Sequence, residues 1–241
     1  MAQYIYGKNA VLERLKAGNP ITDLYLLKGN QALERMVGEY QVAYQLVDKG
    51  FLNNLVSGVH QGIVAKIPEF KTYSLTEGLE TIKKDKLPLL VMIDGLSDPH
   101  NLGAILRNAD ATAVDGVIIS KHRSVSVNAT VAKVAAGALE NVKIIEVVNL
   151  TQTIKKLKNA GYWVVGSALD DSIDYRLVDY RMPLVLVIGS EGKGISQLVK
   201  ENCDYLVQIP MHGIVNSLNA AVASGILLYE ISNQRFPVKE R

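Results

Sequence analysis

The pattern of apolar and polar positions changes about a third of the way along the chain. From Leu87 onward, short apolar runs alternate with segments of helical periodicity. The runs are LLVMI, GVIIS, VKIIEV, YWVVGS, LVLVIG and YLVQIP, and the helical segments lie near residues 102–113, 128–138, 151–160, 195–202 and 218–231. Continuous apolar strands suit a sheet buried on both faces. We therefore predict an α/β fold with a mostly parallel sheet of about six strands and helices on both sides.

The first 70 residues follow a different pattern. Val11, Leu12 and Leu15 share one face of a predicted helix, and the strand-like runs DLYLL, VAYQLV and GIVAKIP come after it. The next stretch is polar and charged and has little apolar periodicity. We predict a small α/β domain over residues 1–70, a linker over 71–86 and a larger domain over 87–241.

Composition narrows the function classes only slightly. With 241 residues and 48% hydrophobic content the chain can bury a substantial core, and its longest apolar runs are too short to cross a bilayer. No apolar targeting segment follows the first residues, so we expect a soluble, cytoplasmic protein. The single cysteine, Cys203, excludes an internal disulfide and is expected to be a small core residue.

The net charge and its distribution do not by themselves indicate a nucleic-acid partner. The net charge is +2, and residues 1–70 hold seven Lys or Arg against six Asp or Glu. A basic patch is the usual electrostatic sign of nucleic-acid binding, and the composition shows none. An RNA partner must therefore be argued from motifs.

Three loops at the predicted carboxyl ends of strands hold the candidate chemistry, because ligands of parallel sheets bind there. They are DGLSDPHNLGAILRNA, IGSEGKGIS and IPMHGIVNSLNAA. The second loop is not a phosphate-binding loop, since Val187 stands where its first glycine belongs and Gly194 where it needs Ser or Thr. The same loop is not a dinucleotide-binding fingerprint, because Gln197 stands where the third glycine of that motif belongs. The histidines have no metal-ligand spacing, so we expect no metal: His60, His100, His122 and His212.

Four segments resemble, in order and spacing, the TrmH/SpoU family of RNA ribose methyltransferases. They are DPHNLGAILRNAD at 98–110, VNATVAKVAAGALE at 127–140, LVIGSEGKGIS at 186–196 and IPMHGIVNSLNAAVASGILLYE at 209–230. At the front, IYGKNAVLERL at 5–15 and GVHQGIVAKI at 58–67 look like the substrate-binding domain, of the ribosomal protein L30e type, in the subgroup that modifies a guanosine of 23S ribosomal RNA.

The resemblance implies transfer of a methyl group from S-adenosylmethionine to a ribose 2'-hydroxyl of structured RNA, without a metal. It also implies a deep trefoil knot of the SPOUT type at the C-terminal end and a homodimer with no membrane contact. Knots are rare exceptions to ordinary chain topology, so this expectation comes from the family alone.

The resemblance also implies which residues form the site. The family motif N-x-G-x-x-x-R falls on Asn101, Gly103 and the catalytic Arg107. The other implied residues are Glu191, Ser217 and Asn219 as catalytic positions, and Ser167, Gly189, Ser190, Gly192, Ile209, Met211 and Leu218 as cofactor-binding positions. A guanidinium resists deprotonation, so we expect Arg107 to hold a phosphate and stabilise the developing alkoxide rather than to act as a base.

The residue patterns leave structural roles open for these side chains. Arg107 lies off the apolar stripe of its helix and could simply face water. Asn101 could cap a helix starting at Leu102, and Ser217 could cap the next helix. Glu191 precedes a predicted helix near Ile195, where the helix dipole favours a carboxylate.

Other positions and functions stay open as well. His60 and Gln61 could contact RNA or hold a loop, and Glu140 could support the site, support a dimer or lie exposed. The Ala- and Gly-rich helix at 218–231 suits a dimer interface or core packing. Transfer RNA is the rival substrate, and an RNA-binding dimer without catalysis is the rival class.

Overall fold

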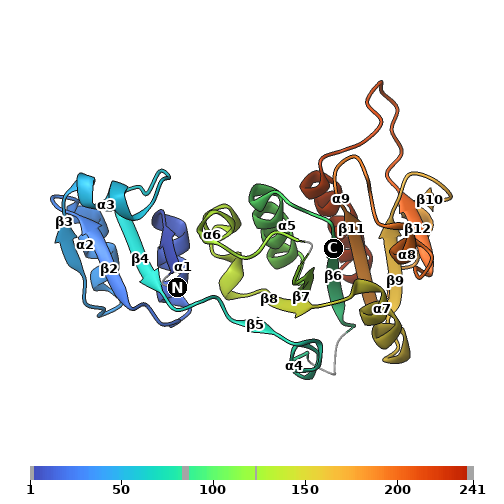
Figure 1. Ribbon diagram of the computed structural model, residues 1–241, viewed down its shortest axis with the longest axis horizontal. Helices are drawn as coiled ribbons and strands as arrows, with labels where there is room; N and C mark the ends of the chain where they lie inside the picture. Colours follow the sequence, from blue (N-terminus) through green and yellow to red (C-terminus); the bar gives the residue numbers. More distant parts are fainter. Residues whose placement is uncertain (1–2, 83–86, 123, 238–241) are drawn as a thin grey trace. The chain divides into compact units, whose positions relative to one another are not determined.

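The computed structural model describes residues 3–82, 87–122 and 124–237 (Figure 1). The chain forms two compact units. The first comprises Met1–Lys71 with Val127–Asn141, and the second comprises Thr72–Ser126 with Val142–Arg241. Each unit is described separately below.

The first unit is a four-stranded sheet between helices. The strands stand in the order β1 (Gln3–Tyr6), β4 (Ile63–Ile67), β2 (Asp23–Leu27), β3 (Gln45–Val47), and all pairs are antiparallel except β2 with β3. The helices are α1 (Lys8–Lys16), α2 (Gln31–Gly38), α3 (Lys49–Leu55) and α6 (Ala129–Ala135), and α6 leads into the short 3-10 helix η1 (Ala138–Glu140). Side chains from α1, α2 and α6 bury one face of the sheet with Leu24, Leu26 and Ala65.

The predicted helix and three strands of the front part are present as α1, β2, β3 and β4. Strand β1 and helices α2 and α3 were not predicted. Strand β1 and helix α3 are short, whereas α2 has an amphipathic spacing that was overlooked, with Leu33 and Val37 one turn apart in the core. The segment 127–141 lies far along the chain from residues 1–71, yet it packs with them: Ala132 of α6 belongs to the same core as Val11 and Leu15.

The second unit has an eight-stranded sheet in which every pair is parallel, as the apolar runs predicted. Its order is β10 (Ile173–Asp174), β12 (Tyr205–Gln208), β9 (Trp163–Ser167), β11 (Leu184–Gly189), β6 (Leu89–Asp94), β7 (Gly116–Ser120), β8 (Lys143–Val147), β5 (Thr72–Tyr73). The six predicted strands form its centre, and β5 and β10 add two residues each at the edges. The α/β class and the parallel sheet are therefore confirmed.

Helices flank this sheet. They are α4 (Leu75–Glu80), α5 (Pro99–Ala111), α7 (Leu150–Asn159), α8 (Gln197–Lys200) and α9 (Ala220–Arg235), with a 3-10 helix η2 (Tyr175–Leu177). Helices α7 and α8 share one core with the sheet, and α5 packs against α9. The expected linker 71–86 contains β5 and α4, while residues 83–86 lie outside the described residues. No helix in the described part of the chain is long and apolar enough to span a bilayer.

The last turn of α9 is fixed to the body of its unit by one arginine. The guanidinium of Arg235 donates to the carbonyl oxygens of Tyr180 at 3.0 Å, Leu87 at 2.9 Å and Met182 at 2.5 Å. Next to it, the side-chain oxygen of Gln234 accepts from the Tyr180 amide at 3.0 Å. Burial lowers the pKa of Arg235, but these carbonyls compensate the buried charge. The final helix therefore has a fixed position along its axis.

Candidate functional site

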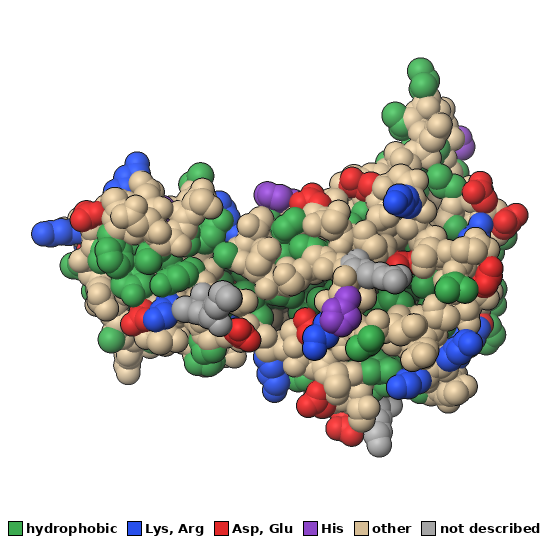
Figure 2. Space-filling model, in the orientation of Figure 1, with side chains coloured by type: hydrophobic (Ala, Val, Ile, Leu, Met, Phe, Trp, Pro, Cys, Tyr) green, Lys and Arg blue, Asp and Glu red, His purple; other side chains and the backbone are tan. Residues whose placement is uncertain are grey.

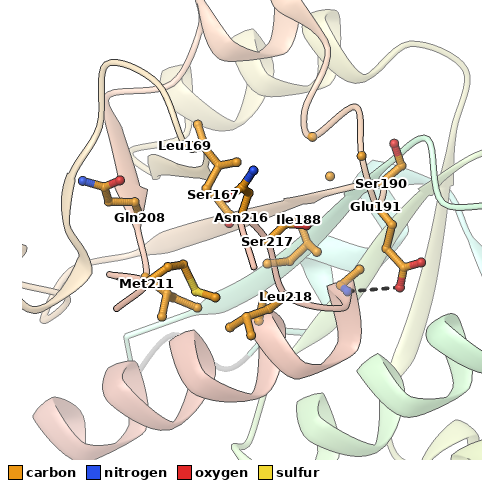
Figure 3. Close-up of a pocket in the computed structure, with 17 residues that line it drawn as sticks. Ser167, Leu169, Ile188, Ser190, Glu191, Gln208, Met211, Asn216, Ser217 and Leu218 are labelled. Carbon is orange, nitrogen blue, oxygen red and sulfur yellow. Dashed lines mark hydrogen bonds between the residues drawn. The ribbon is translucent and has the colours of Figure 1, made fainter. Parts of the chain in front are cut away.

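A cavity of about 270 Å³ lies where β9, β11 and β12 end (Figure 3). Its position agrees with the general rule that parallel sheets bind ligands at the carboxyl ends of their strands. Among the described lining residues Glu191 alone carries a charge, and the walls are mainly apolar. The lining residues are Ser167, Ala168, Leu169, Ile188, Gly189, Ser190, Glu191, Gly192, Gly194, Gln208, Ile209, Met211, Asn216, Ser217, Leu218, Ala220 and Ala223.

The loop after β11 forms one wall and is unusually tight. The Ser190 amide donates to the Gly194 carbonyl at 3.1 Å, and the Gly194 amide donates back to Ser190 at 2.9 Å. This fold brings the backbone of Gly194 and Ile195 so close to Gly189 that a Cβ there would overlap it. Gly192 adopts a left-handed φ of 82°, which L side chains rarely adopt. This wall of the cavity is therefore formed by closely packed backbone atoms rather than by a side chain.

Three side chains from distant segments meet beside the cavity. The amide nitrogen of Asn101, in the first turn of α5, donates to Glu191 Oε1 at 3.0 Å. The amide nitrogen of Asn219 donates to Asn101 Oδ1 at 2.8 Å and also to Glu191 Oε1. Asn101 is buried, with 8% of its surface exposed. Such a network is stabilising only when its members are satisfied, so each residue constrains the other two.

Two members of this network, Asn219 and Glu191, also accept hydrogen bonds from the first backbone amides of α9. Asn219 is the N-cap of α9, and its side-chain oxygen accepts from the amides of Ala221 at 2.9 Å and Val222 at 3.2 Å. Glu191 Oε1 accepts from the Ala220 amide at 3.4 Å, the contact drawn as a dashed line in Figure 3. A carboxylate is favoured at a helix N-terminus because unpaired amides carry partial positive charge there.

These contacts correct three structural expectations. Asn219 caps α9, so Ser217 does not. Asp98 caps α5 by accepting from the amide of the second helical residue at 2.9 Å, so Asn101 lies inside the helix rather than at its cap. Glu191 lies at the start of α9 and not at the short helix α8, whose N-cap is Ser196. Ser217 and Asn101 were taken as caps because each precedes an apolar run, and Glu191 was assigned to the next helix along the chain. In the structure both helices begin at other residues, and Glu191 contacts a later helix.

Helices α5 and α9 are joined a turn further along. The amide nitrogen of Asn108 donates to the Ala221 carbonyl at 2.9 Å and to Ser224 Oγ at 3.1 Å. A Cβ on Gly225 would lie 3.2 Å from that amide nitrogen, so a small residue lets the two helices approach here. This contact keeps the segment with Asn101 in register with the start of α9.

The structure brings most of the implied site residues together. Nine of the thirteen line the cavity: Ser167, Gly189, Ser190, Glu191, Gly192, Ile209, Met211, Ser217 and Leu218. Gly103 is buried within α5. Asn101 and Asn219 lie in the adjoining hydrogen-bond network.

Arg107 is not among these residues. It is exposed on α5 and does not line the cavity. It follows Asn101 by six helical positions, which places it roughly 9 Å further along the axis and about a third of a turn away on the surface. The structure of one chain therefore does not bring the implied catalytic arginine to Glu191.

Sequence reasoning missed several cavity residues: Ala168, Leu169, Ile188, Gln208, Asn216, Ala220 and Ala223. Gln208 is the last residue of β12, and Ala168 and Leu169 directly follow β9. The strand-end rule could have found these three and also Ile188, the second-last residue of β11, since it points to the residues where parallel strands end. Asn216, Ala220 and Ala223 depend on how the 209–219 loop returns to α9.

Glu140 has a structural role in the first unit. It pairs with Arg14 at 3.0 Å, and both side chains are more than nine-tenths buried. The Asn19 amide also donates to Glu140, and Arg14 donates to the Pro20 carbonyl at 2.9 Å. A buried pair that keeps all its partners fixes local geometry. Of the expected alternatives, exposure is wrong, and Glu140 does not line the cavity.

His60 and Gln61 hold the loop before β4. His60 is buried, its Nδ1 accepts from the Gly62 amide at 3.0 Å, and its Nε2 lies 3.1 Å from Asn53 Oδ1. Burial and, second, the charge of Lys49 lower the pKa of His60. Gln61 Oε1 accepts from the amide of the first residue of α1 at 2.8 Å. Both residues thus make structural contacts.

The cavity suits an organic ligand with an apolar, planar part and a few polar groups. Aliphatic side chains provide the walls, and the exposed backbone of the 189–194 loop provides donors and acceptors. Across the described residues, no group of three or more His, Cys, Asp or Glu side chains is placed to hold a metal ion.

Two family models match the chain. The SpoU rRNA Methylase family matches residues 88–229, which include every cavity residue. A model described as RNA 2'-O ribose methyltransferase substrate binding matches residues 4–73.

Individual relatives agree. A relative from Staphylococcus haemolyticus (strain JCSC1435), named as a TrmH family tRNA/rRNA methyltransferase, is 44% identical over 97% of this chain and 96% of its own length. YacO of Bacillus subtilis (strain 168), named for the same family, is 42% identical over 98% of both chains.

Among solved structures, the SpoU methyltransferase AviRb from Streptomyces viridochromogenes in complex with the cofactor AdoMet has the same fold, with a TM-score of 0.81 over 99% of this chain and 92% of its own at 24% identity. The A. aeolicus TrmH/SpoU tRNA modifying enzyme is 35% identical, with a TM-score of 0.58 over 62% of this chain and 76% of its own. A family model that spans more than half of the chain, together with relatives above 40% identity along nearly all of it, shows that this protein belongs to the SpoU rRNA methylase family of RNA methyltransferases.

Proposed function

We propose that this protein transfers a methyl group from S-adenosylmethionine to a ribose 2'-hydroxyl of structured RNA, and that the target is a guanosine of 23S ribosomal RNA. The observation that carries the proposal is the cavity at the ends of β9, β11 and β12 beside the Asn101–Glu191–Asn219 network. The cofactor named in the AviRb complex and the substrate-binding family model over residues 4–73 support it.

The cavity fits S-adenosylmethionine by its chemistry. The apolar side chains of Leu169, Ile209, Met211 and Leu218 can enclose an adenine ring, and the crowded backbone at Gly189 can meet it without an intervening side chain. Ser167, Ser190 and Gly192 lie in the same lining and complete the proposed cofactor set. When bound, the cofactor supplies a sulfonium methyl group that is ready for transfer.

The chain's own residues then have to position the ribose and its proton. We assign Arg107 to the target phosphate and to the charge that develops on the ribose oxygen, since a guanidinium keeps its proton and binds phosphate with two donors. Glu191 Oε1 already accepts from three donors, which suits an anchor for the loop and for the start of α9. Asn101, Ser217 and Asn219 are assigned to the same site, and the proton leaves through another group or water.

A homodimer with a knotted C-terminal end is part of the proposal. Helix α9 and the residue after it present apolar side chains at a spacing of seven residues: Val222 is 51% exposed, Tyr229 59% and Phe236, the C-cap, 66%. The loop before α9 protrudes in Figure 1, its tip is apolar in Figure 2, and Ile214 within it is fully exposed. Such a surface favours burial against a second copy. The trefoil knot and the cytoplasmic location are proposed from the family alone.

The first test is calorimetry of the full-length protein with S-adenosylmethionine, followed by transfer of a labelled methyl group to 23S ribosomal RNA fragments and to transfer RNA. We expect cofactor binding, label on the ribosomal fragment and loss of label with Arg107→Ala. No heat of binding would favour an RNA-binding dimer without catalysis. Mapping 2'-O-methyl positions in cellular RNA with and without the protein would identify the nucleotide.

Transfer RNA is the second candidate substrate. It is favoured by the 35% identity to an enzyme named as tRNA modifying. The family match over residues 4–73 names no particular RNA, so the ribosomal proposal depends on the resemblance of the segments 5–15 and 58–67. Label on transfer RNA alone would select it.

A further inference from the structure

The four-stranded sheet of the first unit has one face that its helices leave partly open. Strand register places Tyr4, Lys66 and Asp23 side by side in one row of that face, and Tyr6, Val64 and Tyr25 in the next. The seven-residue helix α3 covers part of this face through Leu52, which packs on Tyr6 and Val64. The row with Tyr4 is half-buried, and both Tyr4 and Tyr25 pack against that small core.

Aromatic rings border the open part of this face, which we call the tyrosine face (Tyr4, Tyr25, Phe51, Lys66 and Asp23). The rings of Tyr25 and Phe51 lie with centroids 5.2 Å apart and planes tilted by 53°. Phe51 is 41% exposed although it is a large apolar residue. A tilted pair leaves ring surface available to a further planar group.

Lysine side chains lie on this face and on the row beside it. Lys66 Nζ lies 3.3 Å from Asp23, and about a third of each side chain is exposed. In the neighbouring row Lys133 of α6 lies over the buried ring of Tyr6, with its Nζ 4.9 Å from the centroid. Lys49, the first residue of α3, is exposed two residues before Phe51. Rings flanked by lysines are the combination with which proteins stack bases and hold the phosphates between them.

We propose that the tyrosine face stacks unpaired bases of the RNA substrate; this rests on the proposed function, which makes RNA the substrate. The Lys66–Asp23 pair lies within the face, and such charges are depleted at the centre of protein interfaces, so a dry contact with another protein is disfavoured. Bases stack regardless of sequence because every base has a π-face, and the face thus holds unpaired RNA while the cavity selects the reacting ribose.

The test measures binding of labelled RNA to the full-length protein by fluorescence anisotropy. The probes are an oligouridine of about 12 nucleotides and an RNA duplex of the same length, within the site sizes known for stacking proteins. Phe51→Leu removes the ring and keeps an apolar side chain, whereas Phe51→Tyr keeps the ring. Tyr44→Leu is the matched control, since Tyr44 is 37% exposed in the same unit and precedes β3, outside the tyrosine face.

We expect Phe51→Leu to weaken oligouridine binding about tenfold, in the range of a single lost stacking contact, and to leave duplex binding unchanged. Phe51→Tyr and Tyr44→Leu should both bind like the wild type. If circular dichroism shows that Phe51→Leu is unfolded, Tyr4→Leu replaces it with the same expected result.

Three results would overturn the proposal. They are wild-type oligouridine binding by the Leu variants, an equal loss on oligouridine and duplex, or a change of oligomeric state without a change in RNA affinity. Calorimetry with S-adenosylmethionine and the methyl-transfer assay test the proposed function separately. A protein that binds no cofactor but loses oligouridine binding with Phe51→Leu fails as a methyltransferase and retains the stacking face, and the opposite pattern rejects the stacking face alone.

Discussion

Replacing Asn219 by alanine tests whether one side chain both begins α9 and holds the site together. The wild-type side chain accepts from the Ala221 amide at 2.9 Å and the Val222 amide at 3.2 Å, and its amide donates to Asn101 at 2.8 Å and to Glu191. Alanine removes all four contacts and leaves the first turn of the helix without a cap.

The expected cost follows from these contacts. Loss of an Asn cap costs about 1 kcal/mol. Asn101 is 8% exposed and loses the donor to its oxygen, which adds roughly 1–2 kcal/mol for a buried group without a partner. Glu191 keeps two donors and is exposed, so it adds little. We expect about 2–3 kcal/mol in total, or a melting temperature about 5–10 °C lower for a unit of this size.

The assay is chemical denaturation with tryptophan fluorescence, together with calorimetry of cofactor binding. Asn219→Ser is the matched variant: its hydroxyl can still cap α9 but cannot replace the amide that reaches Asn101. It should recover about 1 kcal/mol of stability and still bind the cofactor weakly, because Leu218 and Ala220 of the cavity wall depend on the network. A loss below about 0.5 kcal/mol with Asn219→Ala, which is typical of an ordinary surface substitution, would refute this reasoning.

Three further predictions concern a glycine, a histidine and a cysteine. Gly189→Ala should shift the 190–194 loop and abolish cofactor binding in calorimetry, whereas Gly213→Ala, with open space around it, should not; equal binding by both variants would contradict the close approach. Burial and, second, the charge of Lys49 lower the pKa of His60 in the folded protein. The stability that His60 contributes should be full above pH 6.5 and fall as the pH drops from 6.5 toward the folded pKa, because the unfolded chain takes up the proton first. Melting curves from pH 7.5 to 5 should show this fall, and His60→Gln should flatten the pH dependence. Partial burial raises the pKa of Cys203 to about 12, so iodoacetamide at pH 8 should label the protein only after unfolding in urea, and rapid labelling of the folded protein would be inconsistent with a shielded thiol.

The large sheet could be predicted because its strands are long, apolar and evenly spaced. Leu89–Asp94 and Leu184–Gly189 are buried on both faces, so their sequences contain little but aliphatic residues. The two-residue edge strands carry no such signal, and β5 was taken as part of a linker. The attachment of Val127–Asn141 to the first unit was not predicted either, since a pairing such as Arg14 with Glu140 spans more than a hundred residues and has no local sequence signal.

The candidate site was predicted largely by resemblance, and the structure explains why local reasoning alone falls short. Beside its own helix, Asn101 looks like a cap and Glu191 looks like a carboxylate favoured by a helix dipole, while Ser217 rather than Asn219 looks like the cap of the next helix. Only the tertiary fold brings Asn101, Glu191 and Asn219 within hydrogen-bond distance. Within one chain the structure gives no indication of a catalytic role for Arg107, because the residue is exposed on α5 and does not line the cavity.

Helix α9 has a consequence for synthesis of the protein on the ribosome. It supplies the cap, part of the cavity wall and, through Arg235, the contact with residues near the start of β6. A nascent chain that has emerged only as far as β12 has every strand of the large sheet but an unclosed cavity. Because the ribosomal tunnel retains the most recent residues, the site can close only after α9 has left the tunnel, so a nascent chain that still holds α9 in the tunnel cannot modify RNA.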